Sequence, residues 1–208
     1  FKGSNKIMPG EFDYKIESLG GLSNASTGYD DVHYHVLVPP SNFRESLALL
    51  TNIVLSPEIN INEFNLEKNV VIDEIKQQND QPDEKVFNYF LRRVWESDNY
   101  GKSILGNEKD IQLLNKSDLE SFHKKQYNSK NLCIAIAGNL TEDIYNITKE
   151  INLSYLNTIK TNHFDRNRNT LSAIARTGRE EVDFEDIEFS RIFMAWRIPS
   201  LKEKRITV

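Results

Sequence analysis

Two acidic residues, Glu67 and Glu74, are spaced so that both side chains would project from the same face of a helix. The residues from 60 to 78 repeat apolar side chains at helical spacing, so this stretch predicts a helix. At about 100° per residue, seven residues bring Glu74 to within about 20° of Glu67. Val70 and Val71 lie beside the pair. We therefore expect both carboxylates on the buried side of the helix.

Burying two neighbouring carboxylates is costly, because each loses hydration and the two charges repel each other. A metal cation, an arginine or a set of backbone N–H donors would compensate this cost. From the residues alone two interpretations stay open. One is a structural pair satisfied by arginine or backbone groups, and the other is a metal or acid–base site.

The histidines offer a different metal site. His33 and His35 are two residues apart in a predicted strand and so project from the same face, which would let Glu74 complete a ligand set. We favour this less, because the pair lies on the face opposite Tyr34. His123 stands beside two lysines in a predicted helix, and we expect its side chain to be exposed.

The elements that must position these residues follow from apolar periodicity and from stop signals. Strands are predicted between residues 23 and 38 and over 132–137 and 191–198, and a loop over 99–107. Helices are predicted over 11–19, 43–55, 60–78, 83–95, 117–127 and 141–156. Helices and strands without strict alternation indicate an α+β fold, with helices packed on a mixed, mainly antiparallel sheet.

Local signals mark several ends of these elements. Gly20-Gly21 ends the first helix, Ser41 is the expected N-cap of the second, and Ser117 with Glu120 forms a capping-box pattern. The single cysteine, Cys133, excludes an internal disulfide and lies in an apolar run. We expect it to be a buried thiol.

Composition limits the classes of partner. Hydrophobic residues make up 38% of the 208 residues, which is enough to build a core. The formal net charge is −5, and lysine and arginine are scattered, so a nucleic-acid partner is not expected. No apolar run approaches the roughly 18–20 residues that span a bilayer, so we expect no membrane partner either.

A change in composition suggests the domain organisation. Residues 158–178 are polar and lack periodic apolar positions, so they predict a linker. Residues 1–157 then form the remainder of an N-terminal domain, and 179–208 begin a second, similar domain. The chain opens at Phe1 without an initiator methionine and stops as an element begins, so we expect both ends to continue.

Five segments, in order and in register, resemble the pitrilysin/insulinase/mitochondrial-processing-peptidase family of zinc metallopeptidases. The helix around Glu67–Glu74 is similar to the family's E-R-x-V-V-x-x-E pattern, with Lys68 where arginine is usual. The others are Phe1–Ser4, which resembles the segment after the inverted zinc motif H-x-x-E-H, Gly20–Pro39, Tyr100–Gly106 and Phe122–Asn139.

The resemblance implies roles for four residues. Glu74 would be the third zinc ligand, and Glu67 a carboxylate beside the site that orients it or balances its charge. Asn24 and Ala25 would lie on an edge strand that pairs with an extended peptide substrate. No H-x-x-E-H occurs in the 208 residues. By the family's spacing it would end about two residues before Phe1.

The expected function of the complete protein is therefore zinc-dependent endoproteolysis of peptides or unfolded segments, with a second homologous domain or subunit as partner. The 208 residues alone, an incomplete part of it, are expected to be inactive. The alternative is a non-catalytic homologue that serves as a structural or substrate-binding subunit. The retained Glu67 and Glu74 argue against that alternative. Nothing in the sequence predicts a compartment.

Overall fold

A computed structural model describes residues 2–96, 98–128, 130–139, 146, 177–185, 187–196 and 198 of the chain. The chain divides into two compact units. The first comprises Phe1–Val70 and Lys109–Phe164, and the second comprises Val71–Glu108 and Asp165–Val208. Helix α3, Ile61–Asp80, begins in the first unit and ends in the second.

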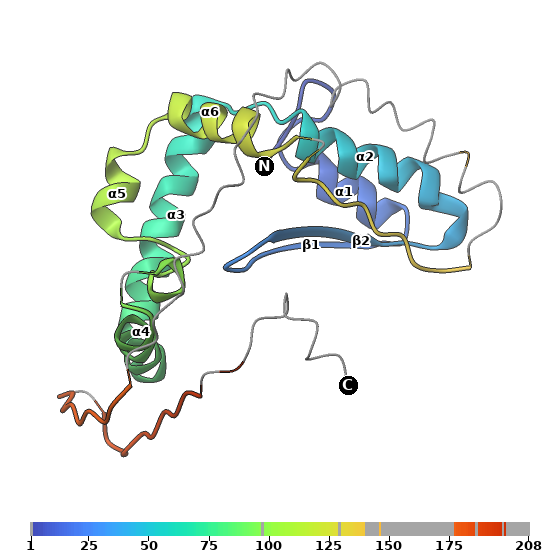
Figure 1. The fold of residues 1–208 in the computed structure, drawn as a ribbon. Helices are drawn as coiled ribbons and strands as arrows, with labels where there is room; N and C mark the ends of the chain where they lie inside the picture. Colours follow the sequence, from blue (N-terminus) through green and yellow to red (C-terminus); the bar gives the residue numbers. More distant parts are fainter. Residues whose placement is uncertain are drawn as a thin grey trace. The chain divides into compact units, whose positions relative to one another are not determined.

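The first unit combines helices with a β-hairpin. Strands β1, Leu22–Thr27, and β2, Val32–Leu37, pair antiparallel. Helices α1, Glu11–Ser18, and α2, Phe43–Leu55, lie side by side over one face of the hairpin (Figure 1). Helix α6, Lys116–Gln126, belongs to the same unit. These elements confirm the predicted α+β class.

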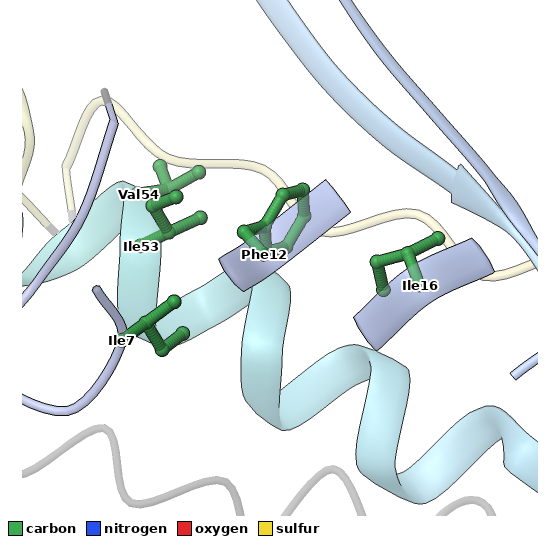
Figure 2. Packing of buried hydrophobic residues seen from close by; sticks show 5 residues of the cluster. All are labelled: Ile7, Phe12, Ile16, Ile53 and Val54. Carbon is green, nitrogen blue, oxygen red and sulfur yellow. The ribbon is translucent and has the colours of Figure 1, made fainter. Parts of the chain in front are cut away.

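The core of this unit lies where α1 and the end of α2 meet. Figure 2 shows its buried side chains, which are Ile7, Phe12, Ile16, Ile53 and Val54. Ile16 is fully buried. Fully burying one such side chain stabilises the folded state by about 1.5–3 kcal/mol. Tyr34 and Val36 of β2 and Tyr127, just after α6, pack against this cluster and remain partly exposed.

The two glycines after α1 turn the chain into β1. Gly20 adopts φ 72°, a left-handed conformation that glycine enters without strain. Its N–H donates to the carbonyl of Glu17, and the N–H of Gly21 donates to the carbonyl of Ile16. These two bonds form a Schellman motif. The predicted stop at Gly20-Gly21 is confirmed.

Two predicted caps are wrong by one or two positions. Helix α2 has the predicted bounds, but a short 3-10 turn over Pro40–Asn42 precedes it and Ser41 does not cap it. The capping box of α6 joins Asn115 and Asp118, not Ser117 and Glu120. Asparagine caps a helix as well as serine does, so propensity alone could not choose between neighbouring candidates.

The second unit contains helix α4, Pro82–Trp95, and the 3-10 turn Asn99–Gly101. A later segment of the chain contacts α4. Glu180 accepts hydrogen bonds from the side chains of Tyr89 and Arg93, and the ring of Phe193 lies 5.5 Å from that of Phe90. One more helix, α5, spans Glu108–Leu113, belongs to the first unit except for its first residue, and was not predicted.

Two predicted strands are absent from the structure. Residues 132–137 have no regular secondary structure, nor do 191–196, and Cys133 is exposed, not buried. A strand is stabilised by hydrogen bonds to a neighbour, and in the described part of the chain the only sheet is the β1–β2 hairpin. The predicted helix over 141–156 and the linker lie almost wholly outside the described residues.

No helix in the described ranges is long and apolar enough to cross a bilayer.

Candidate functional site

Glu67 forms an ion pair near the start of the chain, within the first unit. Its Oε1 atom lies 2.7 Å from Nζ of Lys2, and its side chain is 44% exposed. The hydrogen bond and the charge of Glu67 raise the pKa of Lys2 above its ordinary value. The charge of Glu67 is therefore balanced by an amine, and this carboxylate is only half-buried.

Glu74 is exposed, so the expectation that both carboxylates lie on the buried side of α3 is wrong. The buried residues of this helix are Phe64, Ile72 and Ile75. Counted along the helix, they are centred roughly 90° from the two carboxylates. Apolar residues lie on more than one side of α3, and the largest of these residues, Phe64, is buried. Val70, beside the carboxylates, is 48% exposed.

Glu74 lines a shallow, open hollow in the second unit. The other lining residues are Gln77, Gln78, Gln81 and Glu84, so the surface is polar. The side-chain amide of Gln78 donates to Glu84 at 3.4 Å. This surface offers carboxylate and amide oxygens to a ligand, and no imidazole or thiolate.

The residues described here do not assemble a zinc site by themselves. Zinc in proteins takes three or four ligands from histidine, cysteine, aspartate or glutamate. No group of three or more such side chains that could hold a metal occurs among the described residues. Glu74 can supply one ligand. His33 and His35 are both exposed, and Nδ1 of His33 lies 3.1 Å from Oδ2 of Asp31. The histidine-based site is therefore not supported.

The outer edge of β1 is open among the described residues, because β1 pairs with β2 alone. The N–H of Gly28 donates to the carbonyl of Asp31 at 2.8 Å, which makes these two residues a hydrogen-bonded pair. Antiparallel pairs alternate between bonded and non-bonded. Ala25 and Tyr34 lie three pairs further along the hairpin from Gly28 and Asp31, and they are therefore a non-bonded pair. The backbone N–H and C=O of Ala25 thus point away from β2.

The side chain of Asn24 lies at the same edge. Its Oδ1 atom accepts a hydrogen bond of 2.8 Å from the N–H of Ala25, which agrees with the outward direction of that N–H. Asn24 itself pairs with His35, so its own main chain faces β2. Both residues are exposed. The structure thus places the two predicted substrate-binding residues together on an accessible strand edge.

Sequence reasoning missed a group of contacting side chains that includes Tyr34, the residue of β2 opposite Ala25. The hydroxyl groups of Tyr34 and Tyr127 are 2.7 Å apart, and the ring of His123 stacks on Tyr127 with centroids 4.4 Å apart. Nε2 of His123 lies 2.8 Å from the backbone carbonyl oxygen of Val54. His123 is half-buried, so the prediction that it is exposed is wrong. Only its spacing of four residues from Tyr127 could have indicated the stacking.

Burial sets the protonation of these groups. Burial is the main cause that lowers the pKa of His123, and the hydrogen bond with Val54 opposes it in part. The pKa of Tyr34 is raised, first by burial and then by the hydrogen bond with Tyr127. Burial therefore favours the neutral form of both groups.

Family models match most of the chain. The model of insulinase (peptidase family M16) matches residues 1–108, and that of the peptidase M16 inactive domain matches residues 114–207. An uncharacterized zinc protease of Rickettsia bellii is 32% identical over 143 residues, which are 69% of this chain and 35% of that protein. The probable mitochondrial-processing peptidase subunit beta of Arabidopsis thaliana is 27% identical over 66% of this chain and 26% of its own length.

Solved structures give the same relationship. A protease from Helicobacter pylori superposes with a TM-score of 0.70 at 28% identity, covering 74% of this chain and 38% of that one. A peptidase M16 inactive domain from Pseudomonas fluorescens shares the fold, with a TM-score of 0.66 at 21% identity and the same coverage. The chain thus spans about a third of the length of the relatives it matches. With one family model matching more than half of its residues, the chain belongs to the insulinase family of peptidases, family M16.

Proposed function

We propose that the complete protein is a zinc-dependent metalloendopeptidase that acts on peptides or unfolded segments, and that residues 1–208 are an incomplete part of it. The observation that carries this proposal is the open edge of β1, where Ala25 presents a backbone donor and acceptor outward. An extended chain can add to such an edge by main-chain hydrogen bonds. The relatives named zinc proteases support the choice of metal.

In this proposal Glu74 supplies one metal ligand. The remaining ligands come from residues other than those that the structure describes, since the described residues hold no group of three metal-binding side chains. Zinc, when bound, polarises a peptide carbonyl and lowers the pKa of a bound water. The exposure of Glu74 suits this role, since an accessible carboxylate can join ligands contributed by another segment.

Glu67 has a positioning role in the same proposal. Its pairing with Lys2 fixes the carboxylate where the N-terminal segment meets α3. A carboxylate held near a metal site orients the ligands and balances their charge. Asn24 and Ala25 belong to the strand edge along which the extended substrate pairs, and neither touches the metal.

A metal assay on the complete protein tests the role of Glu74. Glu74→Gln should lower zinc affinity by about 100-fold or more, because a neutral amide is a poor zinc ligand. Asp73→Asn is the matched control, since Asp73 is exposed on the same helix and pairs with Lys76. Bound zinc is measured by mass spectrometry after dialysis, and cleavage of a quenched fluorescent peptide is measured in parallel.

Three results would decide the matter. Full zinc occupancy in the Glu74→Gln protein would exclude Glu74 as a ligand. Chelator-resistant cleavage by the complete protein would exclude the metal mechanism, and absence of any cleavage and any zinc would favour the non-catalytic subunit. The 208-residue chain alone should show no chelator-sensitive cleavage.

A further inference from the structure

The outer edge of β1 presents main-chain groups at every second residue. By the alternation set at Gly28 and Asp31, the N–H and C=O groups of Ser23, Ala25 and Thr27 point away from β2. This spacing matches one side of an extended peptide, whose own outward groups also recur every second residue. Ala25 is the middle one of the three positions.

The middle donor of this edge is already hydrogen-bonded. The side chain of Asn24 folds along the strand so that Oδ1 accepts the N–H of Ala25 at 2.8 Å. An asparagine side chain carries the same carbonyl group as a peptide bond. The amide of Asn24 therefore stands where the backbone carbonyl of an added strand would bind.

We propose that Asn24 is a built-in competitor of the substrate strand: its side chain covers the Ala25 N–H when no peptide is bound and must rotate away when one pairs with β1. This inference rests on the proposed function, because it assumes that an extended peptide is the occupant of the edge. It assigns Asn24 the opposite effect from a residue that recognises substrate. Removing its side chain should strengthen peptide binding.

The competitor has a physical purpose. An uncovered strand edge is a template for pairing with other chains and so promotes aggregation. Covering the middle donor weakens that template, and the exposed side chain is free to leave the edge because both Asn24 and Ala25 are exposed. The cost to a peptide is one exchanged hydrogen bond, which corresponds to a change in affinity of about two- to tenfold.

Peptide affinity of the complete protein and its variants, measured with a chelator present so that the peptide is not cleaved, tests the inference. The probe is the fluorescein-labelled peptide Lys-Val-Thr-Val-Thr-Val-Thr-Lys, followed by fluorescence anisotropy, with circular dichroism to check folding. Asn24→Ala should bind about two- to tenfold more tightly than the natural chain. Asn24→Asp should bind more weakly, because a carboxylate accepts the Ala25 N–H more strongly than an amide does.

Two controls separate the inference from the proposed function. Ser26→Ala changes the next residue on the same face of β1, whose main chain faces β2, and should leave affinity unchanged. A peptide N-methylated at every valine and threonine lacks the main-chain donors on both of its edges and should not bind. One outcome is that the natural protein binds the unmodified peptide and rejects the N-methylated one while Asn24→Ala binds no more tightly than the natural protein. In that case peptides do pair with the edge of β1, and the competitor role of Asn24 is wrong. If neither protein binds the unmodified peptide at about 1 mM, both ideas are overturned.

Discussion

Replacing Gly21 with alanine adds a single methyl group where the chain passes from α1 into β1. A Cβ atom at this position would lie 2.4 Å from Cγ1 of Val38 and 2.8 Å from the carbonyl oxygen of Leu37. It would also lie 3.1 Å from Cγ2 of the fully buried Ile16. The side chain of Val38 can turn, but the carbonyl of Leu37 belongs to β2 and the methyl of Ile16 belongs to the core.

The structure therefore gives a magnitude. Overpacking a core by one methyl group usually costs about 1–3 kcal/mol, and three close contacts place Gly21→Ala at about 3 kcal/mol. Gly20 is the matched comparison: it needs a left-handed backbone, but a Cβ there meets only Pro39, at 3.6 Å. Gly20→Ala should cost about 1–2 kcal/mol, from backbone conformation alone.

Urea unfolding monitored by circular dichroism measures both costs. With a slope of about 1–3 kcal/mol per molar urea, Gly21→Ala should lower the midpoint by roughly 1–3 M. Gly20→Asn should recover part of the loss of Gly20→Ala, because asparagine tolerates the left-handed conformation. An equal or smaller loss at Gly21 than at Gly20 would refute the packing argument, and would mean that β2 shifts to admit the methyl group.

Three further changes test other contacts. Burial lowers the pKa of His123, so the stability that the neutral ring supports is complete above about pH 6.5 and is lost as the pH falls through the lower folded-state pKa. In His123→Gln the midpoint of urea unfolding should therefore change less between about pH 8 and 5 than it does in the natural chain. Tyr34→Phe leaves the Tyr127 hydroxyl without this bond and should cost about 1–3 kcal/mol in urea unfolding, a loss that would be absent if the 2.7 Å contact contributes nothing. Lys68→Met removes two hydrogen bonds of 2.8 Å from the lysine amine to the carbonyls of Gln112 and Leu114, at the end of α5. Amide hydrogen exchange at the end of α5 should then accelerate by about tenfold, whereas Lys68→Arg should retain most of the protection.

Sequence periodicity predicted the elements whose stabilising contacts are local. Helix α2 has the bounds that its apolar spacing indicated, and the Gly20-Gly21 stop forms the expected motif. The strands over 132–137 and 191–198 were wrong because strand formation depends on a hydrogen-bonding neighbour, which no local pattern supplies. Cys133 is exposed for the same reason.

The candidate site shows where periodicity becomes ambiguous. Helix α3 has apolar residues on more than one side, and the pattern did not show that Phe64, Ile72 and Ile75 would be the buried set. The resemblance to zinc metallopeptidases came from ordered motifs and is confirmed by the family models. The roles of Glu67 and Glu74, the peptide-binding role of Asn24 and Ala25, and the domain boundaries remain predictions.

The hydrogen bond between Tyr34 and Tyr127 joins residues 93 positions apart, and this has a consequence for synthesis on the ribosome. At about 5–20 residues per second, Tyr34 is made roughly 5–19 s before its partner. During that interval α1, α2 and the hairpin lack the side chain of Tyr127, which follows α6 and packs against the core cluster. The nascent chain therefore carries an open strand edge beside an incompletely covered apolar surface, a state that a ribosome-associated chaperone would recognise.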